Sequence, residues 1–178
     1  EAGTYLARFS ELMRMILNFS RQDFIPVASE VKFLTEYLDL QQLRFRNKFN
    51  YSIVIDPEID PEETLIPPML AQPFVENAIE HGFAGKTETG NIVIRLLYKN
   101  NQLCYEIDDN GIGLESAQKN KEGQPAKHES LATVITRERM DVLGNQKENN
   151  DITIVDKQKQ NAATSGVNVR FFIPFKLQ

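Results

Sequence analysis

The sequence has one cysteine, two histidines and no long apolar run, and each scarcity excludes a class of protein. The single thiol, Cys104, cannot form an internal disulfide, and it falls within a strand-like alternation, so we expect a buried thiol in a reducing compartment. One cysteine and two histidines cannot build a Cys/His metal cluster. No apolar stretch approaches the roughly 18 residues of a membrane span.

The chain also lacks an excess of basic residues. Its net charge of -5 and its pI of 5.2 argue against nucleic acid or a polybasic membrane surface as partners. An acidic protein can still bind a polyanion through a metal ion and oriented backbone amides. With 178 residues, 41% of them hydrophobic, we expect one globular domain with a possible appendage. The chain starts without Met and without a signal peptide, so we expect a fragment of a longer protein.

Two amphipathic helices are predicted at the start of the chain. Residues 4–20 place apolar side chains at spacings of three and four, and residues 28–46 repeat this pattern after a short linker. Helices joined in this way usually pack antiparallel. Their remaining apolar surface predicts either dimerisation through these helices or docking onto the domain that follows, and the pattern leaves both open.

The rest of the chain predicts a sheet with interspersed helices. Period-two alternation indicates strands, and a helical pattern and a long Lys-, Glu- and Gln-rich loop, typical of a functional lid, follow the second strand hairpin. The predicted strands are 49–55, 91–98, 102–108, 152–156 and 166–172, the loop is 114–130 and the helix is 132–143. This order predicts an α+β fold with helices on one face of a mixed sheet.

The chain is organised around Pro67–Gly82, which reads PPMLAQPFVENAIEHG. The two prolines suit the first turn of a helix, and an apolar side should face the core. Asn77 and His81, four residues apart, should share a polar face. Such a face is either solvated or lines a ligand site.

Three places carry candidate chemistry. The amide oxygen of Asn77 is a hard ligand that Mg²⁺ accepts. At the end of a strand, the carboxylate of Asp109 can accept a hydrogen bond from an exocyclic amine, while Gly111 and Gly113 let the backbone approach a flat base. Residues 130–133 open a helix whose unpaired N–H groups can face phosphates. Each signal alone is weak, but their order, with a lid-like loop between the second and third, is more specific.

At these motifs the sequence resembles sensor histidine kinases of the LytS-like, autolysis-regulator type. IPPMLAQPFVENAIEHG resembles their N box, DDNGIG resembles their G1 box, and ERM and SGVNVRFFIP fit later parts of the pattern. The resemblance covers nearly the whole chain. It implies a Bergerat-type (GHKL) two-layer α/β sandwich preceded by a helical hairpin, with residues 1–47 as an incomplete dimerisation segment and 48–178 as the ATP-binding catalytic domain.

The resemblance implies roles for individual residues. Asn77 would be the Mg²⁺ ligand, Asp109 would hold the adenine amine, and Gly111 and Gly113 would shape the base pocket. His81 would lie near ribose or phosphates. The helix start with Ser130, Leu131 and Ala132 would face the phosphates, although Ser130 and Ala132 replace glycines of the family pattern.

The roles of three charged residues stay open at this point. Glu80 stands where many relatives have Lys, so its carboxylate would repel phosphate unless it turns to solvent. Arg139 could reach phosphates, but an ion pair or a solvated side chain is the commoner outcome. Glu76 is conceivable as a catalytic base, and a solvated carboxylate is favoured over it.

The implied activity is protein histidine kinase chemistry with ATP and Mg²⁺. The phosphoacceptor histidine of the family would lie upstream of Glu1, so this fragment is not expected to phosphorylate itself. Implied partners are a second copy of the chain and a response regulator receiver domain. The fragment would be cytoplasmic, with any anchor in the inner membrane supplied by missing upstream segments. Two alternatives are a degenerate pseudokinase module for dimerisation or sensing and a GHKL-type ATPase; Pro73, where ATPases of this superfamily carry a carboxylate, argues against the second.

Overall fold

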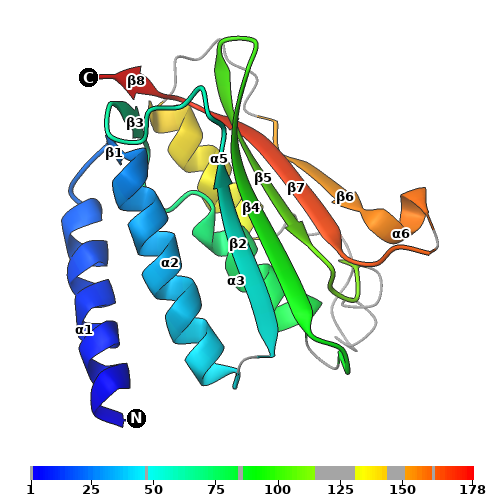
Figure 1. Ribbon diagram of the computed structural model, residues 1–178. Coiled ribbons are helices and arrows are strands. Elements are labelled where there is room, and N and C mark those ends of the chain that lie inside the picture. Colours follow the sequence, from blue (N-terminus) through cyan, green and yellow to red (C-terminus); the bar gives the residue numbers. More distant parts are fainter. Residues whose placement is uncertain (1, 47, 84–85, 115–130, 144–150, 162) are drawn as a thin grey trace.

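Five strands from the middle and end of the chain form a mixed sheet (Figure 1). The computed structural model describes residues 2–46, 48–83, 86–114, 131–143, 151–161 and 163–178. The spatial order is β2 (Phe49–Ile55), β4 (Gly90–Lys99), β5 (Gln102–Asp109), β7 (Val167–Ile173) and β6 (Thr153–Asp156). β2 runs parallel to β4, and the other neighbouring pairs are antiparallel.

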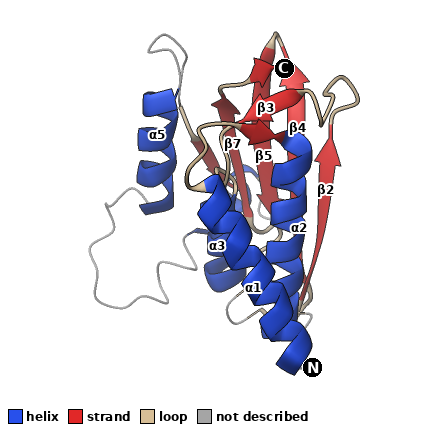
Figure 2. Cartoon of the chain, turned by 90° about the vertical axis from the view of Figure 1, so that its left-hand side faces the viewer, coloured by secondary structure: helices blue, strands red, loops and turns tan. Residues whose placement is uncertain are grey.

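The helices form a second layer behind this sheet. They are α1 (Ala2–Phe19), α2 (Val27–Arg44), α3 (Gln72–Asn77), the π-helical turn η1 (Ala78–Gly82) and α5 (Leu131–Leu143). Figure 2 shows α3 and α5 to one side of the sheet. A short helix, α6 (Lys157–Gln160), follows β6, and a small antiparallel sheet joins β1 (Ile25–Pro26), β3 (Thr64–Ile66) and β8 (Lys176–Leu177). The predicted α+β, two-layer architecture is confirmed.

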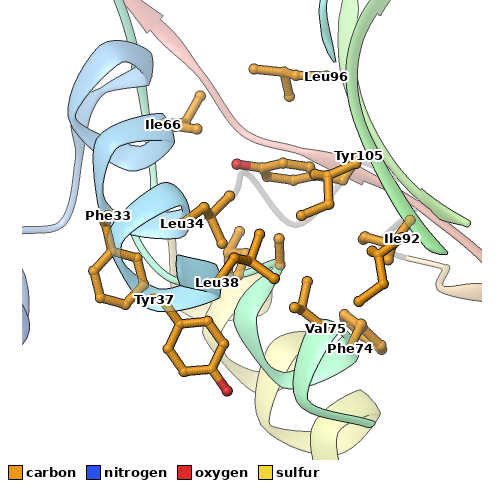
Figure 3. Close-up of a cluster of buried hydrophobic side chains, with 14 of the residues drawn as sticks. Phe33, Leu34, Tyr37, Leu38, Ile66, Phe74, Val75, Ile92, Leu96 and Tyr105 are labelled. Atoms are coloured by element: carbon orange, nitrogen blue, oxygen red, sulfur yellow. The ribbon is translucent and has the colours of Figure 1, made fainter. Parts of the chain in front are cut away.

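The core lies between the sheet and the helices, and burial alternates along β4 because one of its faces packs on the helices. Ile92, Ile94 and Leu96 of β4 are buried and face the helical layer. Figure 3 shows Leu34 and Leu38 of α2 pointing toward Val75 of α3 and Tyr105 of β5. Burying an aliphatic side chain of this size contributes about 1.5–3 kcal/mol, so these contacts join helices and sheet into one unit.

The predicted helical hairpin is present, with α1 and α2 side by side and antiparallel (Figure 1). One face of α1 packs inward through Leu12, Met15 and Phe19. Asp39 of α2 accepts hydrogen bonds from Arg8 of α1 at 3.1 Å and from the Tyr51 hydroxyl of β2 at 2.5 Å. None of the described helices is long and apolar enough to cross a membrane.

The prediction that the central helix starts at Pro67 and Pro68 is wrong. The helix begins at Gln72, with Pro73 in its first turn. A residue that precedes proline is disfavoured from the α region, which affects both Ile66 and Pro67. Met69 then has a φ of 58°, in the left-handed region, so the chain makes a turn before the helix starts. Four short elements, β1, β3, β8 and α6, were not predicted from the sequence pattern.

Candidate functional site

Asn77 is the last residue of α3, where the α-helix changes to a π-helical turn. The Phe83 N–H bonds to the Ala78 carbonyl oxygen at 3.1 Å, an i to i+5 hydrogen bond. Turns of this kind occur frequently at functional sites. The Asn77 side chain is half-buried, and its amide makes no hydrogen bond to any described residue. Its oxygen is therefore not engaged by any part of the chain that the structure describes.

The end of this turn touches the loop after β5. The Ile112 N–H donates to the Gly82 carbonyl oxygen at 2.8 Å. A Cβ placed on Gly111 would lie 2.7 Å from both the Cα and the oxygen of Gly82, so the two backbones are in direct contact. The tertiary structure thus brings together the two motifs that the sequence separates by about thirty residues.

Asp109 is the last residue of β5 and is only 5% exposed. Its Oδ1 accepts hydrogen bonds from the N–H groups of Gly111 at 2.7 Å and Val167 at 3.2 Å. Burial raises the pKa of this carboxyl, and the two N–H groups oppose that rise. Within the described residues, Oδ2 accepts no hydrogen bond. A buried carboxylate with one engaged and one open oxygen can accept a hydrogen bond from a ligand amine.

Asp108, next to Asp109, faces the opposite side of the sheet because side chains alternate along a strand. It pairs with Lys157 at 2.8 Å and accepts a hydrogen bond from Asn168 at 3.0 Å. The alternation therefore assigns the two neighbouring carboxylates to different faces.

Asp156 is a site residue that sequence reasoning missed. Its Oδ2 accepts a hydrogen bond from the Leu114 N–H at 2.8 Å, and its Oδ1 caps α6 through the Gln158 N–H at 3.1 Å. Gly113, with a φ of 81°, leaves room for this carboxylate, since a Cβ there would lie 3.1 Å from Oδ1. Asp156 thus holds the far end of the Asp109–Gly113 loop. A helix-capping Asp after a short strand was the available signal.

The other polar residues of the central helix differ in their contacts. His81 is half-buried and, like Asn77, makes no hydrogen bond to a described residue. Glu76 accepts a hydrogen bond from Gln72 at 2.8 Å and bonds to Tyr37 of α2. Glu80 pairs at 3.7 Å with Arg44 at the end of α2. Glu76 and Glu80 therefore engage α2, which favours a structural role for Glu76 and agrees with an outward-facing Glu80.

The predicted phosphate-facing segment lies partly outside the described residues. Ser130 and the predicted lid, apart from Leu114, fall in the range 115–130, which the structure does not describe. Leu131 and Ala132 begin α5, as the sequence predicted, but their side chains are also outside the described set.

Arg139 lies on α5. Burial lowers the pKa of its guanidinium, while the carboxylates of Glu30 and Asp23, near the start of α2, raise it. This environment favours the ion-pair alternative for Arg139, and its contact with phosphate stays a prediction.

Two solved structures show which fold this chain has. The histidine kinase domain from Erythrobacter litoralis EL346 superposes with a TM-score of 0.57 at 16% identity, covering 96% of this chain and 74% of that one. The catalytic domain of histidine kinase ThkA gives a TM-score of 0.52 at 13% identity, with coverage of 85% and 94%. The chain has the fold of a histidine kinase catalytic domain, so the predicted Bergerat-type architecture is confirmed.

Comparisons of sequence show which histidine kinases this chain is similar to. Residues 1–49 match the model of the histidine kinase family. The sensor protein LytS of Bacillus cereus is 34% identical over 115 residues, 65% of this chain and 19% of that protein. LytS of Staphylococcus epidermidis is 32% identical over 118 residues, 66% of this chain and 20% of that protein. The resemblance to LytS-like sensor kinases is confirmed, and the chain spans about a fifth of the length of these curated relatives.

Proposed function

We propose that this chain is the ATP-binding catalytic part of a sensor histidine kinase, which transfers the γ-phosphoryl group of ATP to a histidine on an upstream helix. One observation carries the proposal: in a histidine kinase fold, the turn that follows Asn77 touches the loop that contains Asp109 and Gly111. An open amide oxygen and an open buried carboxylate thus lie on adjoining elements.

Asp109 selects the base. Its Oδ2 accepts the adenine amine, while the Gly111 and Val167 N–H groups hold Oδ1 and so fix the orientation of the carboxylate. Gly111 has no side chain between the base and the loop. Gly113, in its left-handed conformation, leaves room for Asp156, which accepts a hydrogen bond from the next N–H, that of Leu114. Because the protein itself makes these contacts, little of the binding energy is spent on ordering the pocket.

Asn77 holds the metal. Mg²⁺ commonly takes one or two protein ligands and completes its shell with water and phosphate oxygens, so a single amide oxygen fits it. Bound Mg²⁺ supplies charge neutralisation of the phosphates during in-line transfer. His81, on the same stretch of helix, is placed toward ribose or phosphate, and the segment at Ser130, Leu131 and Ala132 toward the phosphates.

The helical segment 1–47 provides dimerisation, and residues 48–178 provide catalysis. α1 has a second apolar face of exposed side chains, Leu6, Phe9, Met13 and Leu17, at helical spacing. A second copy of the chain covers this face. The phosphorylated histidine passes its phosphoryl group to a response regulator receiver domain, and this use of ATP places the chain in the cytoplasm.

Nucleotide titration with and without Mg²⁺ tests the proposal. We expect millimolar or tighter binding of a non-hydrolysable ATP analogue, strengthened at least about tenfold by Mg²⁺, or about 1.4 kcal/mol. Asn77→Ala should abolish the Mg²⁺ effect, and Asp109→Asn should weaken binding with or without Mg²⁺. Calorimetry measures both.

Two matched variants control for general damage. Asn18→Ala removes an exposed amide on α1, and Asp108→Asn alters the carboxylate on the opposite face of the sheet. Both should bind like the parent. No binding by the parent at millimolar nucleotide would support the pseudokinase alternative. Steady phosphate release when the parent is incubated with ATP itself would support an ATPase.

A further inference from the structure

Glu30 is a charged residue whose side chain is completely buried. It lies in the first turn of α2, next to the point where β1 pairs with β3. Burial of an ionisable carboxyl is costly unless it has hydrogen-bonding partners. No motif of the sequence explains why an acidic residue occupies this position.

The partner of Glu30 is a backbone group just before the central helix. The Met69 N–H donates to both carboxylate oxygens, at 3.1 Å to Oε1 and 3.0 Å to Oε2. Met69 has a φ of 58°, a conformation that costs a side-chain-bearing residue free energy and persists only when its surroundings hold it. An unpaired N–H inside the protein is costly, so the Glu30 oxygens, which accept in either protonation state, stabilise this turn.

The turn at Met69 determines where α3 starts. Leu70 and Ala71 are buried immediately after it, and the Ala71 carbonyl oxygen accepts the first helical bonds, from Phe74 at 3.1 Å and Val75 at 3.2 Å. Asn77 lies less than two turns further on. A shift of the Met69 turn therefore moves the helix that carries Asn77.

Glu30 also interacts electrostatically with one residue of α5 and one of β5. The positive charge of Arg139 on α5 acts on it, and its own charge acts on Tyr105 of β5. α5 follows the segment predicted to be the lid. Glu30 thus lies where α2, the turn before α3, β5 and α5 meet.

We propose that Glu30 is a positioning residue for the metal ligand: by holding the Met69 N–H it fixes α3, and through α3 the Asn77 amide, relative to α2. This inference rests on the proposed function and adds to it a link between the helical hairpin and the Mg²⁺ site. The acceptor oxygen of Glu30 performs the role, so Gln, which keeps one oxygen of the same geometry, should replace it.

The test is the ratio of nucleotide dissociation constants without and with Mg²⁺. Glu30→Ala should reduce this ratio at least about threefold from the parent value, or about 0.65 kcal/mol, while the affinity without Mg²⁺ changes less. Glu30→Gln should keep the parent ratio. Leu12→Ala, which removes a buried side chain on α1 away from Met69, controls for lost stability and should also keep it.

Amide hydrogen exchange tests the same inference without nucleotide. Glu30→Ala should accelerate exchange over residues 69–77 at least about tenfold more than Leu12→Ala does. An unchanged Mg²⁺ ratio in Glu30→Ala, or exchange no faster than in Leu12→Ala, would overturn the positioning role. A parent that binds no nucleotide but shows the exchange pattern would refute the proposed function and leave the Glu30–Met69 link established.

Discussion

At the scale of single residues, the contact between Gly82 and Gly111 leaves no room for a side chain on Gly111. A Cβ on Gly111 would meet backbone atoms of Gly82 at 2.7 Å, and backbone cannot move aside as a flexible side chain does. We expect Gly111→Ala to lower the free energy of unfolding by about 1–3 kcal/mol and to weaken nucleotide binding. Urea denaturation measures the first effect. Gly3→Ala, with nothing within 4 Å of the added carbon, should show no loss, and equal stability of the two variants would contradict the prediction.

The buried carboxyl of Glu30 should make stability depend on pH. Burial raises its pKa from 4.5 to about 7, against the opposing effects of the Met69 N–H and Arg139. The folded state therefore holds the proton more tightly than the unfolded state, so this stabilisation is fully present below pH 4.5 and is lost as pH rises through 7.

The comparison that isolates this effect is parent against Glu30→Gln. Between pH 4.5 and 7.5 the unfolding free energy of the parent, relative to the variant, should fall by up to about 3 kcal/mol. Denaturation curves at a series of pH values measure it. A constant difference across this range would show that Glu30 titrates with its ordinary pKa.

At the scale of elements, the central helix shows what a sequence pattern can and cannot predict. The spacing of Phe74, Ala78 and Ile79 correctly predicted a helix with a buried side, because local periodicity follows from helical geometry. The predicted start of this helix was wrong. Met69 adopts a left-handed conformation and its N–H bonds to Glu30, 39 residues earlier in the chain, so the turn before the helix depends on a distant residue. The π-helical turn after Asn77 ends at Gly82, which contacts Gly111. A local sequence pattern cannot predict this contact either.

The strands were easier to predict than the short connecting elements. Burial in β4 alternates with period two because one face of this strand is buried, whereas β5 is buried over five consecutive residues. β3 and β8 are two or three residues long, so they carry too little pattern to be recognised. Asp156 was missed because its contact with the Asp109–Gly113 loop is made through Leu114, 42 residues earlier in the chain, and its local signal shows only a helix cap.

At the scale of the whole molecule, the outer face of α1 should decide the oligomeric state. Leu6 and Leu17 are 65% and 58% exposed on a helix whose opposite side already packs on α2. We expect the parent to dimerise and a Leu6→Glu, Met13→Glu double variant to weaken the dimer at least about tenfold, since it places charge in an apolar interface. Light scattering over a concentration series measures this change.

Leu177→Glu provides the matched control. Leu177 is 73% exposed but lies on β8, away from α1, so the charged variant should dimerise like the parent. A monomeric parent, or loss of the dimer in both variants, would contradict dimerisation through α1.

The sequence by itself determined the class of fold, the alternation of the strands and the residues with the right chemistry for a nucleotide and a metal. These properties follow from local periodicity and from the side chains themselves. Only the tertiary structure decided that the turn after Asn77 touches Gly111, that Asp109 bonds to the Val167 N–H, and that the Met69 N–H bonds to Glu30. Each of these depends on contacts between residues about 30 or more positions apart, and such contacts form only when the helices pack on the sheet.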